Sequence, residues 1–192
     1  SVFHDEGIVY NGVISVGGDD ITQDIAVAFD TSIEEAKRLK EDYGCAKSSI
    51  INNEQFVEFV QATNKDSHHL SSLQLSEVIE DAYLDILSIL KNELRHHNIE
   101  ANIKSGFVLC GGGAQALGCE ELVREFFTRR VKIGVVQRNR ISGLETILMD
   151  YRYTGSIGLL LHQKDLPQVD LMMPRGRNGV IEKIKEAITG NF

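Results

Sequence analysis

The sequence predicts an α/β fold in which a small α+β subdomain is inserted into a larger subdomain. One sign is a short apolar strand, Phe107–Leu109, that leads through three consecutive glycines into a helix at about residues 120–127. The second sign is a change of character after Lys47, where short strand candidates precede a long helix, about Leu73 to His97. Two β-rich parts joined by one long helix indicate that the chain leaves the larger subdomain near Gly44 and returns to it with the Phe107 strand.

Composition excludes several classes of function. The chain has 192 residues, 42% of them apolar and 25% charged, which is typical of a globular protein. A formal net charge of −8 gives no electrostatic support for nucleic-acid binding. Three cysteines without a C-x-x-C pair indicate neither a disulfide framework nor a zinc site, and favour a reducing cytosol. We find no signal peptide and no apolar run near the roughly 18 residues of a membrane span. Because the chain opens with Ser in a strand-like pattern, we expect a longer parent protein.

The first forty-four residues predict a hairpin and two helices. Val2-Phe3 and Ile8–Tyr10 are the strands of the hairpin, and the second strand is expected to continue to Val16. Asp19 or Asp20 is expected to cap a helix that ends before Asp30. Ser32 then begins a second helix, with Glu35 completing a capping box and Gly44 ending it.

Four charged residues follow one side of that second helix. Glu34, Lys37, Lys40 and Glu41 are spaced so that they share a face. The ordinary interpretation is a solvated face with salt bridges, and the alternative is a set of side chains that reach a ligand.

The middle of the chain predicts three short strands and one long helix. The strand candidates are Ser48–Ile51, Gln55–Val60 and about Ser67–Leu70. Ser71-x-x-Gln74 has the pattern of a capping box, so the long helix is expected to begin there. Its continuous apolar stripe indicates packing against a sheet or against other helices.

The glycine run Gly111, Gly112 and Gly113 is the strongest candidate for a ligand site. Glycines let a backbone approach a flat ligand or a phosphate where a Cβ would intrude. The run matches neither the dinucleotide fingerprint nor a P-loop. Taken alone it therefore fits a tight connection as well as a binding turn. No catalytic triad is visible, and the paired histidines do not form a metal clamp because adjacent side chains diverge.

The end of the chain predicts a strand over Val131–Val136, a helix of small and apolar residues from Tyr153, a linker and a final helix. The linker spans 166–176 and the final amphipathic helix spans 177–192. This helix is expected either to bind a membrane surface or to dock on its own domain. The side chains expected to enter the membrane are Val180, Ile181, Ile184, Ile188 and Phe192.

Several stretches together resemble the FtsA family, the actin-like bacterial cell-division proteins. Val16–Ala26 is similar to the family's V-G-G-x-x-[IV]-T-x-D-I-A segment, and Asp30–Ala46 is similar to the helix that follows it. Leu109–Gln115 matches the adenosine motif of the actin-like ATPase superfamily, and Tyr153–Leu160 looks like the family's last helix. The resemblance spans nearly the whole chain and corresponds to the C-terminal half of the family.

The resemblance implies an actin-like ATPase fold of the ribonuclease H-like type, with a larger subdomain at 1–45 plus 99–165 and a smaller one at 46–98. It also implies ATP, with Mg²⁺ in the full-length protein. The residues implied to contact the nucleotide are Gly111, Gly112, Gly113, Gln115, Glu34, Lys37 and Lys40. The family's D-x-G-x-G-T phosphate loop does not occur in this sequence. We therefore expect half of a nucleotide cleft and no phosphoryl-transfer machinery in this chain, with weak ATPase activity left open for the full-length protein.

The resemblance further implies an adaptor at the division septum, on the cytoplasmic face of the inner membrane. Its partners would be the C-terminal tail of FtsZ, further copies in a filament and the membrane surface, with no nucleic acid. The family commonly has an arginine near the position of Ala82, where this chain reads Glu80–Asp85, so the FtsZ contact is expected to differ. The alternative is another actin-like ATPase, such as a PilM-type pilus-assembly protein, a chaperone or a sugar-kinase relative.

Overall fold

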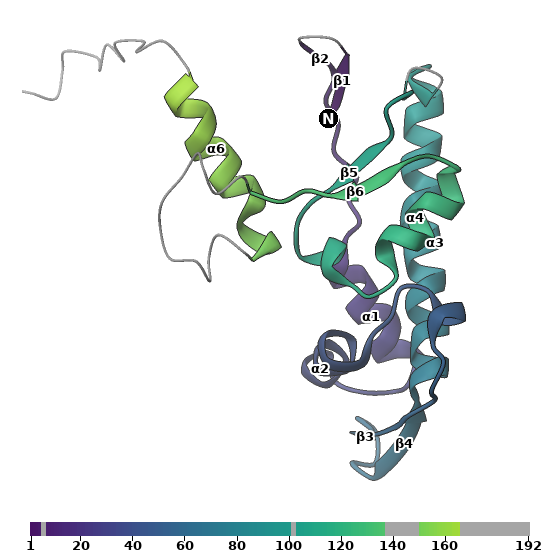
Figure 1. Ribbon diagram of the computed structural model, residues 1–192. Coiled ribbons are helices and arrows are strands. Elements are labelled where there is room, and N and C mark those ends of the chain that lie inside the picture. Colours follow the sequence, from purple (N-terminus) through teal and green to yellow (C-terminus); the bar gives the residue numbers. More distant parts are fainter. Residues whose placement is uncertain (5–6, 101–102, 137–149, 166–192) are drawn as a thin grey trace, which may run out of the picture. The chain divides into compact units, whose positions relative to one another are not determined.

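The computed structural model describes residues 1–4, 7–100, 103–136 and 150–165 (Figure 1). Two units follow each other along the chain, residues 1–158 and 159–192, and α6 crosses the boundary between them. The predicted linker and final helix lie outside the described residues. The described elements are β1 Val2–His4, β2 Gly7–Tyr10, α1 Gly18–Ala28, α2 Ile33–Tyr43, η1 Ser48–Ile50, β3 Phe56–Val60, β4 Ser67–Ser71, α3 Ser72–His96, β5 Phe107–Leu109, η3 Gly112–Gln115, α4 Cys119–Phe127, β6 Val131–Ile133, η5 Tyr151–Tyr153 and α6 Thr154–Asp165.

The described strands pair in three separate two-stranded sheets. The β1–β2 and β3–β4 pairs are antiparallel hairpins. β5 and β6 pair in parallel, and α4 lies between them in the sequence. In the parallel pair Phe107 lies opposite Val131, and α4 provides the crossover that parallel strands require. This arrangement confirms the predicted mixed α/β content and the strand–glycine turn–helix unit.

Three predicted strands are wrong in extent or in type. The second strand of the hairpin ends at Tyr10 rather than Val16, and Val13 is 89% exposed, because no described strand pairs with this stretch. The strand expected over Ser48–Ile51 is absent, and Ser48–Ile50 form the 3₁₀ turn η1 instead. The backbone N–H and hydroxyl of Ser48 both donate to the Glu80 carboxylate, which stabilises a turn at that point. The strand expected over 131–136 ends at Ile133.

Hydrogen bonds at the helix ends determine where α1 and α2 begin and end. Gly17, rather than Asp19 or Asp20, is the N-cap of α1, and Asp20 accepts a 2.6 Å hydrogen bond from the Gly17 N–H. Ser32 is the N-cap of α2 as predicted, and Gly44 is its C-cap. The Glu35 carboxylate binds the Arg38 guanidinium, with both oxygens engaged, instead of reaching back to complete a capping box.

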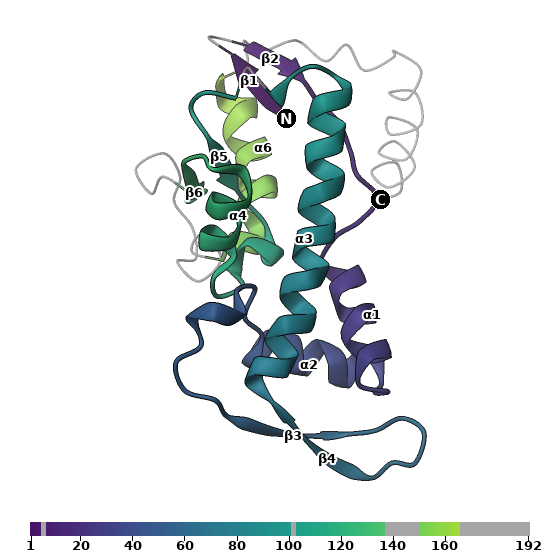
Figure 2. The ribbon, with the colours of Figure 1, turned by 90° about the vertical axis from the view of Figure 1, so that its right-hand side faces the viewer.

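The long helix α3 is common to two hydrophobic cores (Figure 2). It begins with the predicted Ser71–Gln74 capping box, in which each side chain binds the other residue's backbone N–H. Its N-terminal half packs against α1, α2 and the β3–β4 hairpin, and its later turns pack against α4 and β6. The partly buried ring of Tyr83 packs against both cores. This helix therefore supports both regions of the fold and presents its middle turns to the cleft.

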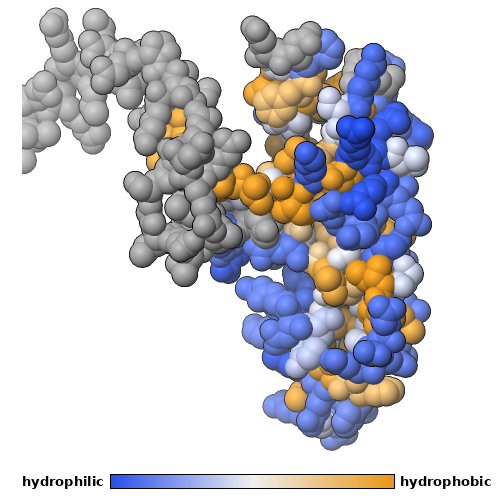
Figure 3. Space-filling model, in the orientation of Figure 1, coloured by the Kyte–Doolittle hydropathy of each residue, from blue (hydrophilic) through white to orange (hydrophobic). Residues whose placement is uncertain are grey.

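Apolar side chains also remain exposed on the strands. Figure 3 shows them over the β1–β2 hairpin and the β5–β6 pair. Phe3 is 70% exposed and Val108 is 68% exposed. Because large apolar side chains are seldom gathered on a free surface, these strands have the character of a sheet that is covered only in part by the described residues.

Candidate functional site

The glycine run forms a tight turn between β5 and α4. Gly111 has φ +93° and ψ 176°, a conformation that is open only to glycine. Gly112 and Gly113 begin η3 with negative φ, so their missing side chains have another role than backbone freedom. A Cβ built on Gly112 would meet the Arg152 Cγ at 3.4 Å, which is an ordinary contact distance. The first glycine is thus required by the backbone, and the second leaves space beside the turn.

A cleft of about 980 Å³ opens beside this turn. Its walls come from the start of α1, the end of α2 with the segment that follows it as far as Gln55, two positions of α3 (Ser72 and Tyr83), and the glycine turn with Arg152. The Ala46 N–H donates a 2.7 Å hydrogen bond to the Leu117 carbonyl, which joins the segment after α2 to the segment after the turn. The volume is within the range of small-molecule and cofactor sites.

Lys40 is the cation that α2 contributes to the wall. Its Nζ donates hydrogen bonds of 2.5 Å to the Gly18 carbonyl and to Thr22 Oγ1, both on α1. Burial lowers the pKa of Lys40, and the nearby Asp19 carboxylate partly opposes that shift. The ammonium group is therefore held by α1 and is partly withdrawn from water, so an anionic ligand would gain from meeting it.

The structure brings only some of the sequence-predicted site residues to the cleft. Lys40, Gly112, Gly113 and Gln115 line it. The other three candidates on the described chain are not among its lining residues: Gly111, Glu34 and Lys37.

Glu34 and Lys37 lie on the solvent side of α2. Glu34 is exposed. Lys37 Nζ stands 3.9 Å from a Glu41 carboxylate oxygen, and both of these side chains are more than 60% exposed. Glu34 and Lys37 therefore lie on a solvated helix face with an ion pair, which is the first of the two interpretations given for this face above. The five predicted membrane-contacting residues lie outside the described residues: Val180, Ile181, Ile184, Ile188 and Phe192.

Three residues in or beside the cleft that the sequence does not single out form hydrogen bonds with the glycine turn or with one another. Tyr83 donates a 2.7 Å hydrogen bond from its hydroxyl to the Gly113 carbonyl. Asp150 accepts hydrogen bonds from Gln115 and Arg152, and Arg152 lines the cleft. The sequence offers only a chemical indication of their roles. Polar side chains such as those of Tyr83, Asp150 and Arg152 need hydrogen-bond partners when they are partly buried. No spacing rule connects them to residues 111–115.

The described residues form neither a metal-binding cluster nor a membrane-spanning helix. Nowhere in that part of the chain do three or more His, Cys, Asp or Glu side chains gather in a way that would hold a metal ion. None of the helices described is long and apolar enough to cross a membrane.

The architecture defines the class of protein first. Two crystal structures of MreB5 of Spiroplasma citri have a similar fold. The first, bound to ADP, matches with a TM-score of 0.61 and 16% sequence identity over 79% of this chain and 45% of that chain. The second, bound to AMPPNP, matches with a TM-score of 0.58 and 14% identity over 91% of this chain and 47% of that one. The chain has the actin-like fold.

Sequence comparison then gives the family. The model of "Cell division protein FtsA" matches residues 1–158, and the chain belongs to this family. It is 28% identical to the cell division protein FtsA of Pseudomonas aeruginosa, over 100% of this chain and 48% of that protein. It is 30% identical to the FtsA of Escherichia coli, over 86% of this chain and 40% of that protein. The chain thus spans about half the length of the curated relatives it matches. The family match favours the cell-division hypothesis over the other actin-like ATPases.

Proposed function

We propose that this chain forms the adenosine-binding half of an ATP-dependent, actin-like cell-division adaptor. The observation that carries the proposal is the cleft beside Gly112 and Gly113, with Lys40 fixed in its wall, in a chain of the FtsA family. Both MreB5 structures with this fold were obtained with an adenine nucleotide bound.

The lining residues fit a nucleotide chemically. Gly112 and Gly113 leave a flat surface with no side chain, against which a base can lie. Lys40 offers a partly desolvated positive charge to the anionic end of the nucleotide. Glu41 lines the same cleft and offers carboxylate oxygens, which are good acceptors for ribose hydroxyls. We propose that Mg²⁺ and the phosphate groups are held mainly by residues outside this chain, because the family's phosphate loop is missing from the sequence.

We further propose the division of labour that the family resemblance implies. Residues 1–45 and 99–165 form the nucleotide-binding subdomain, and residues 46–98 form the smaller subdomain that receives the FtsZ tail. Exposed acids at Asp81 and Asp85 on α3 favour a tail contact made through basic side chains rather than through acidic ones. Self-association into filaments and the helix at 177–192 complete a tether at the cytoplasmic face of the inner membrane.

Nucleotide binding tests the first part of this proposal. The full-length protein and its Gly112→Val variant are titrated with ATP by calorimetry. Wild type is expected to bind ATP, and the variant at least ~10-fold more weakly, because a branched side chain would fill the space that the base needs. Gly7→Val is the matched control, since a Cβ on Gly7 meets nothing within 4 Å and Gly7 does not line the cleft. Unchanged ATP affinity in a folded Gly112→Val protein contradicts the proposal.

The isolated 192-residue chain provides a second check. It is expected to bind ATP far more weakly than the full-length protein and not to hydrolyse it, because most charge-assisted phosphate contacts are absent. Micromolar ATP affinity of the isolated chain contradicts the proposed division of the cleft.

Vesicle binding tests the tether. Co-sedimentation of the full-length protein with anionic vesicles under polymerising conditions is expected to fail for Ile184→Glu, because a charge enters the apolar stripe. A single short helix binds weakly, so the effect depends on many tails presented together by a filament. Lys183→Glu, in the same helix but off the stripe, is the control and should weaken binding less. If Ile184→Glu leaves vesicle binding intact, the tether proposal is wrong.

A further inference from the structure

A polar cluster stands at the edge of the cleft, next to the glycine turn. Its members are Gln115, Asp150 and Arg152. The Asp150 carboxylate accepts a 2.9 Å hydrogen bond from the Arg152 backbone N–H, a 2.6 Å bond from Arg152 Nη2 and further contacts from Arg152 Nε. It also accepts a 3.2 Å hydrogen bond from Gln115 Nε2. The Asp150 side chain is 18% exposed, whereas that of Arg152 is 69% exposed.

The charge of Asp150 fixes the orientation of the Gln115 amide. Hydrogen bonds from Arg152 hold the pKa of Asp150 at about 2, so its carboxylate carries no proton near neutral pH and can only accept hydrogen bonds. The amide of Gln115 must therefore turn its NH₂ group to Asp150. Its carbonyl oxygen is left as the group that is free to meet a ligand, because no described residue donates to it.

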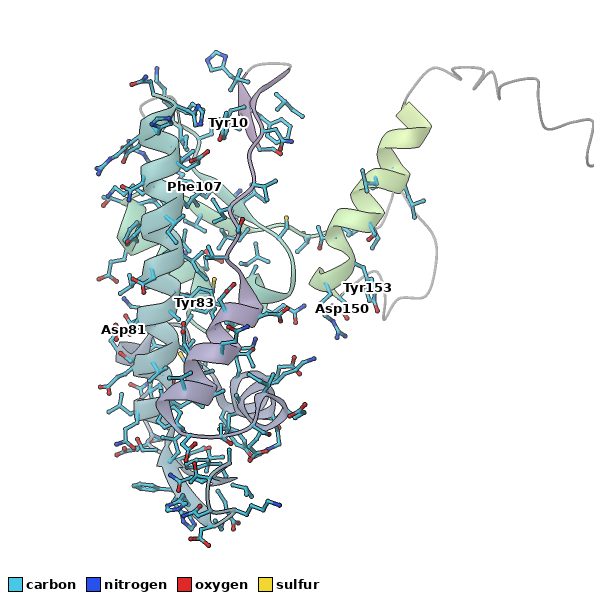
Figure 4. All side chains as sticks on the ribbon, turned by 180° about the vertical axis from the view of Figure 1, so that it is seen from behind. Tyr10, Asp81, Tyr83, Phe107, Asp150 and Tyr153 are labelled. Atoms are coloured by element: carbon cyan, nitrogen blue, oxygen red, sulfur yellow. The ribbon has the colours of Figure 1, made fainter. Side chains whose placement is uncertain are left out.

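This orientation distinguishes two classes of purine. The edge of adenine carries a 6-amino group, which donates hydrogen bonds, whereas guanine and hypoxanthine carry a 6-oxo group, which accepts them. The Gln115 carbonyl oxygen would accept a hydrogen bond from the 6-amino group and would be repelled by the 6-oxo oxygen. Figure 4 shows Asp150 beside Tyr153 at the start of α6, outside the glycine turn itself, so the orienting group and the surface on which a base would lie come from different elements.

We propose that Gln115, oriented by Asp150, makes the cleft selective for 6-amino over 6-oxo purine nucleotides. Gln115 is the specificity-determining residue and Asp150 is a positioning residue, which Arg152 in turn holds in place. The proposal rests on the proposed nucleotide-binding function and adds the chemical basis on which the base is chosen.

The test compares ATP with ITP, which has the same ribose and triphosphate but a 6-oxo base. Both are titrated into the full-length protein by calorimetry. Wild type is expected to prefer ATP by at least ~10-fold, about the effect of one hydrogen bond exchanged for a repulsion. In Asp150→Asn the new amide can donate to the Gln115 carbonyl, which turns the Gln115 NH₂ toward the base. The ATP-to-ITP affinity ratio should then fall to one or reverse.

Two further variants keep the test decisive. Gln115→Met has a similar shape but no polar atoms at its end, and should bring the ratio close to one even if Asp150→Asn does not fold. Lys40→Met should weaken both nucleotides by the same factor and leave the ratio unchanged. A wild-type ratio near one, or a ratio in folded Asp150→Asn and Gln115→Met equal to that of wild type, overturns the inference and leaves ATP binding standing. Failure of wild type to bind either nucleotide overturns the proposed function, and this inference with it.

Discussion

The hydroxyl of Tyr83 donates a hydrogen bond of 2.7 Å to the backbone carbonyl of Gly113 and so joins the middle of α3 to the glycine turn. Burial raises the pKa of Tyr83 well above its ordinary value, so the hydroxyl keeps its proton and remains a donor. Figure 4 shows Tyr83 on the inner side of α3 and Asp81 on the outer side. A shift of α3 would therefore reach the turn through this bond.

Removal of that hydroxyl should affect the turn more than the core. Tyr83→Phe keeps the ring and is expected to lower the free energy of unfolding by about 1 kcal/mol, the usual net value of one hydrogen bond. We also expect weaker ATP binding by the full-length protein, because Gly113 is no longer held. Denaturant unfolding and calorimetry measure the two effects. Tyr153→Phe is the control, since the Tyr153 hydroxyl makes no hydrogen bond to a described residue; equal effects of the two changes would contradict the role of Tyr83.

The two neighbouring glycines should respond differently to alanine. Gly111→Ala forces a side chain into a glycine-only backbone conformation and is expected to cost about 1–3 kcal/mol of stability. Gly112→Ala meets only the flexible stem of Arg152 at an ordinary distance and is expected to change stability by less than about 0.5 kcal/mol. Thermal and denaturant unfolding of both variants provide the measurement. Equal losses of stability would show that the whole turn is structural.

Glu80 is expected to matter to the fold, unlike the exposed Glu77 one turn earlier in the same helix. Its carboxylate accepts from the backbone N–H of Ser48 at 2.8 Å and from the Ser48 hydroxyl at 2.5 Å. Glu80→Ala leaves both donors without that partner, and we expect a loss of about 1–3 kcal/mol in denaturant unfolding. Glu77→Ala, on an exposed position of the same helix, should be nearly neutral. A neutral Glu80→Ala would mean that water replaces the carboxylate at no cost.

The link between the first hairpin and α3 should weaken in both acid and alkali. The Tyr10 hydroxyl donates a 2.5 Å hydrogen bond to Glu93, and His97 Nε2 lies 3.2 Å from the same carboxylate. The bond to Tyr10, followed by the nearby histidine, lowers the pKa of Glu93 from its ordinary 4.5, and the same bond raises the pKa of Tyr10 from 10.0. The Glu93 contribution is therefore complete above pH 4.5 and is lost as the pH falls through its lowered pKa. The Tyr10 contribution is complete below pH 10 and is lost as the pH rises through its raised pKa.

The comparison of wild type with Tyr10→Phe measures this link. The stability advantage of wild type should be constant in the neutral range and shrink toward both limits. An advantage that does not vary with pH would contradict the assignment.

The elements that could be predicted were those set by local chemistry. The capping box at Ser71–Gln74 and the cap at Ser32 each depend on residues three apart, so the starts of α2 and α3 could be predicted to within a residue. The lengths of the strands could not be predicted in this way, because a strand extends only over the residues that pair with a neighbouring strand. Val13 and its neighbours have strand-forming side chains but no described partner, and the stretch after Lys47 is bent by a carboxylate more than thirty residues away.

The cleft could be predicted only through the family resemblance and only in part. Lys40 and Gln115 could be predicted because they belong to stretches that resemble motifs of the family. Asp150 could not be predicted, because its role depends on a contact with Gln115, 35 residues away in the chain. Glu34 and Lys37 share a face with Lys40 in the sequence pattern, but helix periodicity does not show where along that face the wall of a cleft ends.

The sharing of α3 between two cores has a consequence for unfolding. Each core supplies part of the packing that keeps this 25-residue helix in place, and Tyr83 contacts both. Melting of either core therefore removes support from the other, and no intermediate with only one core intact gains enough to accumulate. Residues 1–158 should melt as one cooperative unit, with equal calorimetric and van't Hoff enthalpies, and a mutation in the β3–β4 hairpin should lower the melting temperature recorded at the glycine turn.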